Sequence, residues 1–204
     1  MSGKRIAIGL TGGIAAGKST IAGWLAEAGF PVVDADELVS DLYRAGQPGA
    51  EAVRELFGAD ALDATGAVDH HALAGRVFSD PQALERLESR IHPLVRDAFA
   101  AIAHATEGPC VLEATLLVEA GYAPDFDIVV TVEADPETRV RRAIARGLPE
   151  EEARARLEAQ ADSGLRTRAA HRVLRNDGSL EDLRRSTDTM IKEIREMAGT
   201  APAR

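Results

Sequence analysis

Residues 6–29 join an apolar run, a glycine-rich loop and a helical pattern in direct succession, and few folds accommodate that order. Residues 6–10 are apolar and partly β-branched, which is typical of a strand buried on both faces of a parallel sheet. After the loop, apolar residues recur at helical spacing from Ile21, and Gly29 stands where a left-handed C-terminal cap is expected. The pattern predicts a strand, a loop over residues 12–19 and a helix that begins near Lys18.

The loop sequence Gly-Gly-Ile-Ala-Ala-Gly-Lys-Ser has the residue types that a polyphosphate ligand requires. Glycines permit the torsions by which several backbone N–H groups converge on one anion. The helix N-terminus adds unpaired N–H groups and a positive dipole end, Lys18 can reach the β and γ phosphates, and Ser19 can ligate Mg²⁺. An ordinary glycine-rich turn is the alternative, but the complete spacing in this context favours a nucleoside triphosphate site. The expected nucleotide ligands are Gly12, Gly13, Ile14, Ala15, Ala16, Gly17, Lys18, Ser19 and Thr20.

The length of 204 residues and the 45% of hydrophobic residues are enough for one main domain with a sizeable core. No apolar run approaches the roughly 18 residues that span a bilayer, and no signal peptide precedes the first strand, so we expect a cytoplasmic protein without membrane contact. Cys110 is the single cysteine and lies in an apolar run. We expect a buried, inert thiol there.

The net charge of −9 disfavours a general nucleic-acid binder. The distribution of charge is more informative, because ten arginines and only five acidic residues lie between residues 139 and 175. One basic segment in an acidic protein indicates a small, highly charged anion as the ligand.

Further strands are expected at residues 31–33, 110–113, 128–132 and 173–174, separated by helical patterns. The alternation predicts an α/β fold with a doubly wound parallel sheet. The stretch from about residue 49 to 105 is helical throughout, which is too long for a simple crossover and indicates a subdomain that covers a substrate. A capping-box pattern at Ser179 starts the C-terminal helix.

Two carboxylates, Asp34 and Asp36, end the second predicted strand. In an open α/β sheet the strand ends face the ligand crevice, so one of them could accept the proton of an attacking hydroxyl and the other could hold Mg²⁺ through water. The alternative is that one of them caps the following helix.

Arg139, Arg142 and Arg146 fall on one face of a predicted helix. A solvated face is one interpretation, and a clamp on transferring phosphates by Arg142 and Arg146 is the other. The pairs Glu150–Arg154 and Glu152–Arg156 are expected to be ordinary ion pairs one helical turn apart.

Three further short motifs each allow two interpretations. Residues 176–178, Asn-Asp-Gly, form either a plain turn or a loop that reads the adenine edge. The His92-Pro93 pair could simply interrupt a helix, because proline displaces its predecessor from helical torsions. His70 and His71 have no neighbouring cluster of ligands in the sequence and are not expected to bind metal.

Taken together, these motifs resemble the dephospho-coenzyme A kinase family from Ile8 to about residue 195. The loop alone points only to a superfamily. The specific marks are Thr11-Gly12-Gly13-Ile14, Val33-Asp34-Ala35-Asp36, Ile91-His92-Pro93, Leu116-Leu117-Val118-Glu119, the helix with Arg142 and Arg146, and Asn176-Asp177-Gly178.

The resemblance implies a P-loop NTPase fold similar to nucleotide kinases, with a core (1–36, 106–138 and 170–198), a helical coenzyme A subdomain (about 37–105) and a basic lid (about 139–169). It implies phosphorylation of the ribose 3′-hydroxyl of dephospho-coenzyme A with ATP and Mg²⁺, with Asp36 as general base. The alternatives are another small-molecule kinase of this superfamily and a non-catalytic nucleotide switch. The oligomeric state stays open.

The same resemblance assigns a role to each matching position. The catalytic set is Asp36, Lys18, Arg142 and Arg146. Nucleotide contacts extend to Asn176 and Gly178, and Ser19 and Asp34 would hold the metal. Substrate contacts fall to Thr11, Asp34, Asp36, His92, Leu117 and Glu119.

Overall fold

The computed structural model describes residues 3–160 and 163–199, and its elements divide into two compact units. One unit combines residues 1–33 with 103–204 and contains most of the sheet, while the other comprises residues 34–102 and is helical. Residues 161 and 162 of the expected lid lie outside the described residues.

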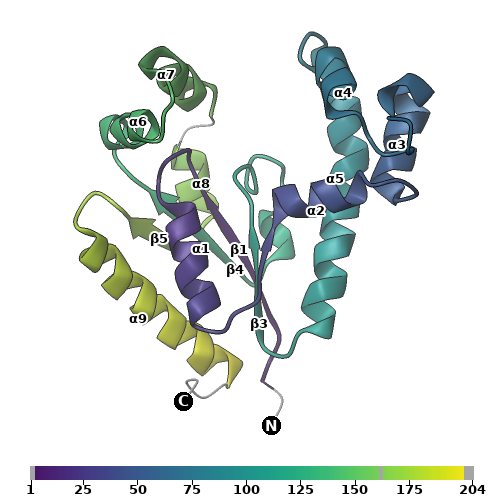
Figure 1. The fold of residues 1–204 in the computed structure, drawn as a ribbon. Helices are drawn as coiled ribbons and strands as arrows, with labels where there is room; N and C mark the ends of the chain where they lie inside the picture. The colour runs from purple at the N-terminus through teal and green to yellow at the C-terminus, as the bar shows by residue number, and fades with distance from the viewer. Residues whose placement is uncertain (1–2, 161–162, 200–204) are drawn as a thin grey trace. The chain divides into compact units, whose positions relative to one another are not determined.

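A five-stranded sheet with the order β2-β3-β1-β4-β5 forms the centre of the first unit (Figure 1). Strand β1 pairs in parallel with β3 and with β4, and β4 pairs in parallel with β5, so that Ile8 lies opposite both Val111 and Ile128. Non-consecutive neighbours require crossover helices, so the predicted doubly wound α/β fold is confirmed. The strands are β1 (Ile6–Gly12), β2 (Val32–Asp34), β3 (Pro109–Glu113), β4 (Ile128–Glu133) and β5 (Arg172–Arg175).

Helices α1 (Lys18–Glu27) and α9 (Leu180–Ala198) cover one face of this sheet (Figure 1). Alternate residues of β1, from Ile6 to Leu10, point to that face and pack with Leu25 of α1 and Ile194 of α9 in one apolar cluster. The capping box that starts α9 is present, since Ser179 and Asp182 exchange side-chain and backbone hydrogen bonds as predicted.

The opposite face of β1 is built around Gly9, which has no side chain to hold neighbours away. A Cβ atom at Gly9 would lie 2.7 Å from Cδ1 of Leu117 and 3.0 Å from the ring of Phe126. The loop that follows β3 can therefore pack directly on the sheet. Cys110 is buried in β3 as expected, and burial raises the pKa of its thiol.

The remaining helices of the first unit follow β4 in the chain and supply the basic segment. They are α6 (Pro136–Ala145), α7 (Glu150–Ala159) and α8 (Ser163–Ala169), and a short 3-10 helix, η2 (Ala123–Asp125), precedes β4. The expected ion pairs Arg154–Glu150 and Arg156–Glu152 are confirmed on α7.

The second unit, residues 34–102, is helical as its sequence predicts. A single antiparallel bridge, Leu62 with Val68, interrupts that pattern in its described residues. The elements are α2 (Ala35–Leu42), α3 (Pro48–Phe57), η1 (Ala59–Ala61), α4 (His70–Val77) and α5 (Pro81–Ala105), the last of which continues past residue 102.

Helix α5 passes through Pro93 without a break, so the interpretation of His92-Pro93 as a helix interruption is wrong. Proline removes one backbone hydrogen bond and usually kinks a helix. Here a buried apolar stripe that includes Ile91 and Val95 runs along both sides of the proline. Packing of that stripe favours one continuous helix over the local cost of the missing bond.

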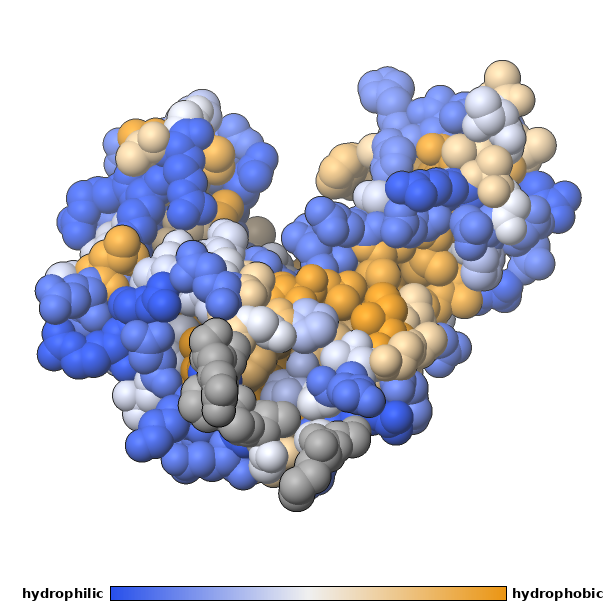
Figure 2. Space-filling view, turned by 60° about the horizontal axis from the view of Figure 1, so that its bottom comes forward, coloured by the Kyte–Doolittle hydropathy of each residue, from blue (hydrophilic) through white to orange (hydrophobic). Residues whose placement is uncertain are grey.

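Charged and polar side chains dominate the surface, as Figure 2 shows for one face, where hydrophobic residues gather in limited areas. Large hydrophobic side chains that stay exposed are scattered along the chain, and Phe78 is the most exposed of those described at 88%. Within the described residues, no helix combines the length and the apolar character needed to cross a membrane.

Candidate active site

The phosphate loop connects β1 to α1 at the carboxyl end of the sheet, and α1 begins at Lys18 as predicted. Gly17 precedes the helix with a φ of +110°, a conformation that favours glycine, and no side chain caps the helix. Among the described residues, none accepts a hydrogen bond from the backbone N–H groups of Gly17, Lys18 or Ser19. These donors and the helix dipole remain available to an anion.

Lys18 forms an ion pair with Glu113, in which Nζ lies 2.6 Å from Oε1. Both side chains are mostly buried, at 17% and 10% exposed. Glu113 is the last residue of β3, beside β1. The carboxylate therefore compensates the ammonium charge beside the loop and holds it in place.

Sequence reasoning missed Glu113 as a site residue. The available signal was an acidic residue that ends a fully buried apolar strand, where a charge is costly without a partner. Asp34 and Asp36 were recognised by their position at a predicted strand end, and Glu113 has the same kind of position.

Asn176 connects the loop to α6 through both ends of its side-chain amide. Its Nδ2 donates to the carbonyl of Ala16 at 2.7 Å, and its Oδ1 and backbone carbonyl accept from Nη2 of Arg142 at 3.2 and 3.0 Å. A Cβ atom at Gly17 would collide with the amide of Asn176, so only glycine fits at that position. Residues 176–178 are thus more than a plain turn, while adenine contacts by Asn176 and Gly178 stay a prediction.

The three arginines of α6 have different environments although they share one helical face. Arg139 is 6% exposed and bonded to the loop, Arg142 is half-buried, and Arg146 is exposed at the helix end. Among the described residues, Nη1 of Arg142 is buried without a hydrogen-bond partner, and the Arg146 side chain forms no ion pair or hydrogen bond. The solvated-face interpretation therefore fits Arg146 alone.

A buried ion network includes Glu133, the last residue of β4, and sequence reasoning missed its central residue, Arg166 on α8. This guanidinium is 1% exposed, and its Nε lies 2.9 Å from Oε1 of Glu133 while its Nη1 lies 3.0 Å from Oε1 of Glu119. Burial alone would lower the pKa of Arg166, but the hydrogen bonds and charges of the two glutamates raise it above its ordinary value. Burial, together with the charge of Arg166, lowers the pKa of nearby Arg139.

Three predicted substrate contacts of the first unit lie in its interior. The Thr11 hydroxyl is fully buried and donates to the carbonyl of Thr115, and Leu117 is fully buried against Gly9. Glu119 is held by Arg166, and its second carboxylate oxygen is buried without a hydrogen-bond partner in the described residues. Their positions suit shaping the site, and substrate contact by these residues stays a prediction.

Asp34 and Asp36 belong to the second unit and differ in role. Strand β2 ends at Asp34, so the expectation that both residues end this strand is wrong for Asp36, which lies in the first turn of α2. Asp34 is the N-cap, because its Oδ1 accepts from the backbone N–H of Asp36 at 2.7 Å. The Asp36 carboxylate is exposed and has no ion pair or hydrogen bond with the described residues.

His92 lies on α5 in the second unit and is half-buried. Burial lowers the pKa of its imidazole, an effect that the charge of Glu88 partly opposes. In the described part of the chain, no three His, Cys, Asp or Glu side chains gather closely enough to hold a metal ion.

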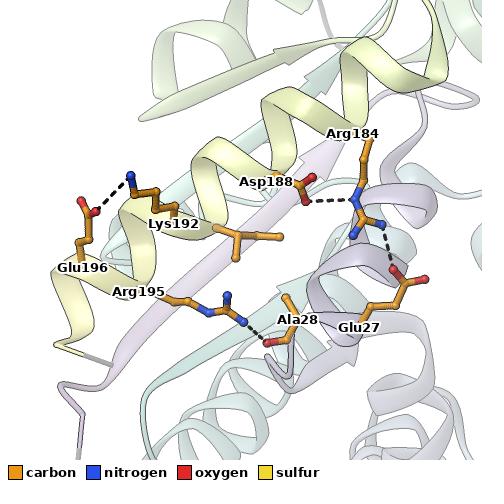
Figure 3. A pocket seen from close by; sticks show the side chains of 8 residues that line it. Glu27, Ala28, Arg184, Asp188, Lys192, Arg195 and Glu196 are labelled. Atoms are coloured by element: carbon orange, nitrogen blue, oxygen red, sulfur yellow. Dashed lines mark hydrogen bonds and ion pairs between the residues drawn. The ribbon is translucent and has the colours of Figure 1, made fainter. Parts of the chain in front are cut away.

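The larger of the two described cavities, about 530 Å³, lies between α1 and α9 (Figure 3). Its charged lining pairs internally: Arg184 contacts Glu27 and Asp188, and Arg195 donates to the carbonyl of Ala28 at 2.6 Å. Three basic and three acidic side chains line the cavity, so it has no net charge for a polyphosphate. The contacts of Arg184 with Glu27 and of Arg195 with Ala28 hold α9 against the end of α1.

Comparison with known proteins identifies the family. The model of the dephospho-CoA kinase family matches residues 6–182. A dephospho-CoA kinase of Frankia casuarinae is 41% identical over 189 residues, which are 92% of this chain and 81% of that protein.

Solved structures agree with this match. A protein from Thermus thermophilus has a TM-score of 0.78 and 39% identity over 94% of this chain and 98% of that chain. The dephospho-CoA kinase from Campylobacter jejuni has a TM-score of 0.67 over 93% of this chain and 97% of that chain, and at 24% identity it supports the fold alone. The chain belongs to the dephospho-CoA kinase family.

Proposed function

We propose that this chain transfers the γ-phosphoryl group of ATP to the ribose 3′-hydroxyl of dephospho-CoA, which yields CoA and ADP. Family membership supports phosphorylation of dephospho-CoA in CoA biosynthesis as the activity. The observation that carries the proposal is the uncapped N-terminus of α1, where the backbone N–H groups of Gly17, Lys18 and Ser19 have no acceptor among the described residues and the helix begins at Lys18. Phosphoryl transfer needs this kind of positioning and charge neutralisation more than covalent chemistry.

Lys18 exchanges partners when the nucleotide binds. In the structure its charge is held by Glu113, and the phosphates of ATP offer more negative charge at the same place. The buried Nη1 of Arg142, which has no hydrogen-bond partner in the described part of the chain, is a second donor for that charge, because a guanidinium suits planar recognition of phosphate. Arg146, which is unpaired among the described residues, can approach the transferred group from the end of α6.

Magnesium fits the residue types present, although no three carboxylates gather into a metal site within residues 3–160 and 163–199. Mg²⁺ usually keeps several waters and binds through one or two protein oxygens together with substrate phosphates. The Ser19 hydroxyl and the Asp34 carboxylate are the proposed ligands, and the Glu113 carboxylate is another oxygen donor beside the loop. When bound, the ion neutralises charge on the phosphates.

Asp36 is the proposed general base. Its carboxylate is exposed and is not engaged with any described residue, so it can accept the proton of the 3′-hydroxyl. Asp34 is less available as a general base, because one of its carboxylate oxygens caps α2. The proposed location of the enzyme is the cytoplasm, and its proposed partner is the small-molecule substrate alone.

Release of ADP with and without dephospho-CoA tests the proposal. The expected result is turnover that requires dephospho-CoA and forms one 3′-phosphate per ADP, which phosphorus NMR of the product detects. Turnover only with a different hydroxyl acceptor would indicate another small-molecule kinase. A nucleotide switch would show no acceptor-dependent turnover.

A further inference from the structure

The side-chain oxygen of Gln160 contacts the phosphate loop from the C-terminal end of α7. This Oε1 atom accepts a hydrogen bond from the backbone N–H of Ile14 at 2.8 Å and another from Nη2 of Arg139 at 2.6 Å. Gln160 is itself partly buried. One oxygen atom thus joins the loop, α6 and the end of α7.

Arg139 completes the contact from the other side of the same residue. Its Nε donates to the carbonyl of Ile14 at 2.9 Å, so both backbone polar groups of Ile14 are held by side chains from outside the loop. The guanidinium also lies so close to Gly13 that a Cβ atom there would collide with it. Arg139 therefore leaves no room for a side chain at position 13.

Ala15, the next residue of the loop, has a φ of +57° and is the one described non-glycine residue with a left-handed backbone. Such a conformation persists only where the surroundings over-determine it. The Ala15 side chain packs with Val140, Ala143 and Ala153 of α6 and α7. The carbonyl of the peptide that precedes Ala15 is held by Arg139, and Gln160 holds both Arg139 and the N–H of Ile14. A left-handed residue in this position turns successive N–H groups toward a common anion.

We infer that Gln160 is a positioning residue for phosphoryl transfer. It holds the N–H of Ile14 directly and the carbonyl of Ile14 through Arg139, so that Ala15 stays left-handed and the loop amides face the phosphates. The inferred effect on phosphoryl transfer rests on the proposed function, whereas the inferred effect on ATP binding rests on the geometry of the loop. Gln160 is the C-cap residue of α7. Unfolding or displacement of this helix would therefore also lower the affinity for the nucleotide.

The test compares Gln160→Met, which removes the acceptor at similar side-chain length, with Gln160→Glu, which keeps acceptor oxygens toward Arg139 and Ile14. Loss of a hydrogen bond of this kind should weaken ATP binding roughly tenfold in calorimetry and raise the KM for ATP by about the same factor. The KM for dephospho-CoA should hardly change. Gln160→Glu should retain most of the wild-type ATP affinity.

Glu158→Gln is the matched control, because Glu158 is exposed on the same helix and is bonded to no described residue. Circular dichroism and thermal midpoints should show that all three variants fold. If Gln160→Met does not fold, Gln160→Asn replaces it, since the shorter side chain withdraws the oxygen without removing the amide.

Wild-type ATP affinity in the variant that lacks or withdraws the oxygen would overturn the inference. Equal loss of affinity in that variant and in Gln160→Glu would overturn it as well, because the acceptor oxygen would then be irrelevant. A wild-type enzyme without turnover on dephospho-CoA would contradict the proposed function, and the ATP affinities would still decide the role of Gln160.

Discussion

The ammonium of Lys18 lies 2.6 Å from the carboxylate of Glu113, so the charge that is proposed to meet the phosphates is paired in their absence. Lys18→Ala should lower kcat by about 10²–10³-fold or more, because it removes a charge directed at the transferred group. It should also lower the thermal midpoint, because a mostly buried carboxylate loses its partner. Steady-state kinetics and calorimetry measure the two effects.

A double variant separates the loss of activity from the loss of stability. Lys18→Met combined with Glu113→Gln leaves no unpaired charge, so stability should largely return while activity stays lost. Near-normal turnover in either lysine variant would contradict the assignment of residues 12–19 as the phosphate loop.

Arg142→Ala and Arg146→Ala should both lower kcat more than they raise the KM for ATP, since charge spreads over the transferred group only as it moves. The structure adds a difference between them. Arg142 holds Asn176, whereas the Arg146 side chain forms no hydrogen bond or ion pair with a described residue, so only Arg142→Ala should lower the thermal midpoint. A rise in the KM for ATP with unchanged kcat would show uniform binding instead.

Arg166→Met should lower the free energy of unfolding by about 3–5 kcal/mol, because it leaves the buried Glu133 carboxylate without its partner. Arg168→Met is the control, since Arg168 lies on the same helix α8 and is exposed. Urea unfolding of both variants checks the prediction. Equal stability losses would mean that the network around Arg166 contributes nothing specific.

Burial raises the pKa of Tyr43 from 10.0 to about 12, which makes alkaline stability testable. Above pH 10 the unfolded chain loses this proton while the folded chain keeps it, so rising pH favours the unfolded state until about pH 12. Tyr43→Phe lacks this effect. Its free energy of unfolding relative to wild type should therefore increase between pH 8 and pH 11, and a constant difference would contradict the burial-raised pKa.

Local signals in the sequence were sufficient for the loop and the sheet. The strand before Gly12, the loop and the start of α1 at Lys18 are neighbours in the chain, so spacing alone specifies them. The contacts of Glu113, Gln160 and Arg166 were not accessible in this way. Each partner lies far away in sequence, 95 residues in the case of Lys18 and Glu113, and only the tertiary fold brings them together.

The spacing of arginines along α6 did not predict which of them are buried, for a related reason. A charged residue on a helix face has the same spacing whether it meets solvent, as Arg146 does, or a buried acceptor, as Arg139 does. The low helix propensity of proline also led to a wrong prediction at Pro93, because the packing of α5 outweighs that propensity. The sequence indicated that one of Asp34 and Asp36 caps a helix and that the other has a different role. Which residue is the cap depends on where the strand ends, and the structure shows that it ends at Asp34.

The role of Asp36 tests the proposed reaction most directly. Asp36→Asn keeps the size of the side chain and removes the base, so kcat with dephospho-CoA should fall by about 10²–10⁴-fold. ATP affinity should not change, because residues 12–19 are untouched. Asp34→Asn is the comparison, and if Asp34 serves the metal, higher Mg²⁺ concentration should partly relieve its defect.

The decisive measurement is kcat of Asp36→Asn with dephospho-CoA as acceptor, together with its ATP affinity by calorimetry. We predict a large loss of kcat at wild-type ATP affinity, which would assign the exposed carboxylate on α2 to activation of the acceptor hydroxyl. An Asp36→Asn enzyme with wild-type kcat would contradict the general-base role.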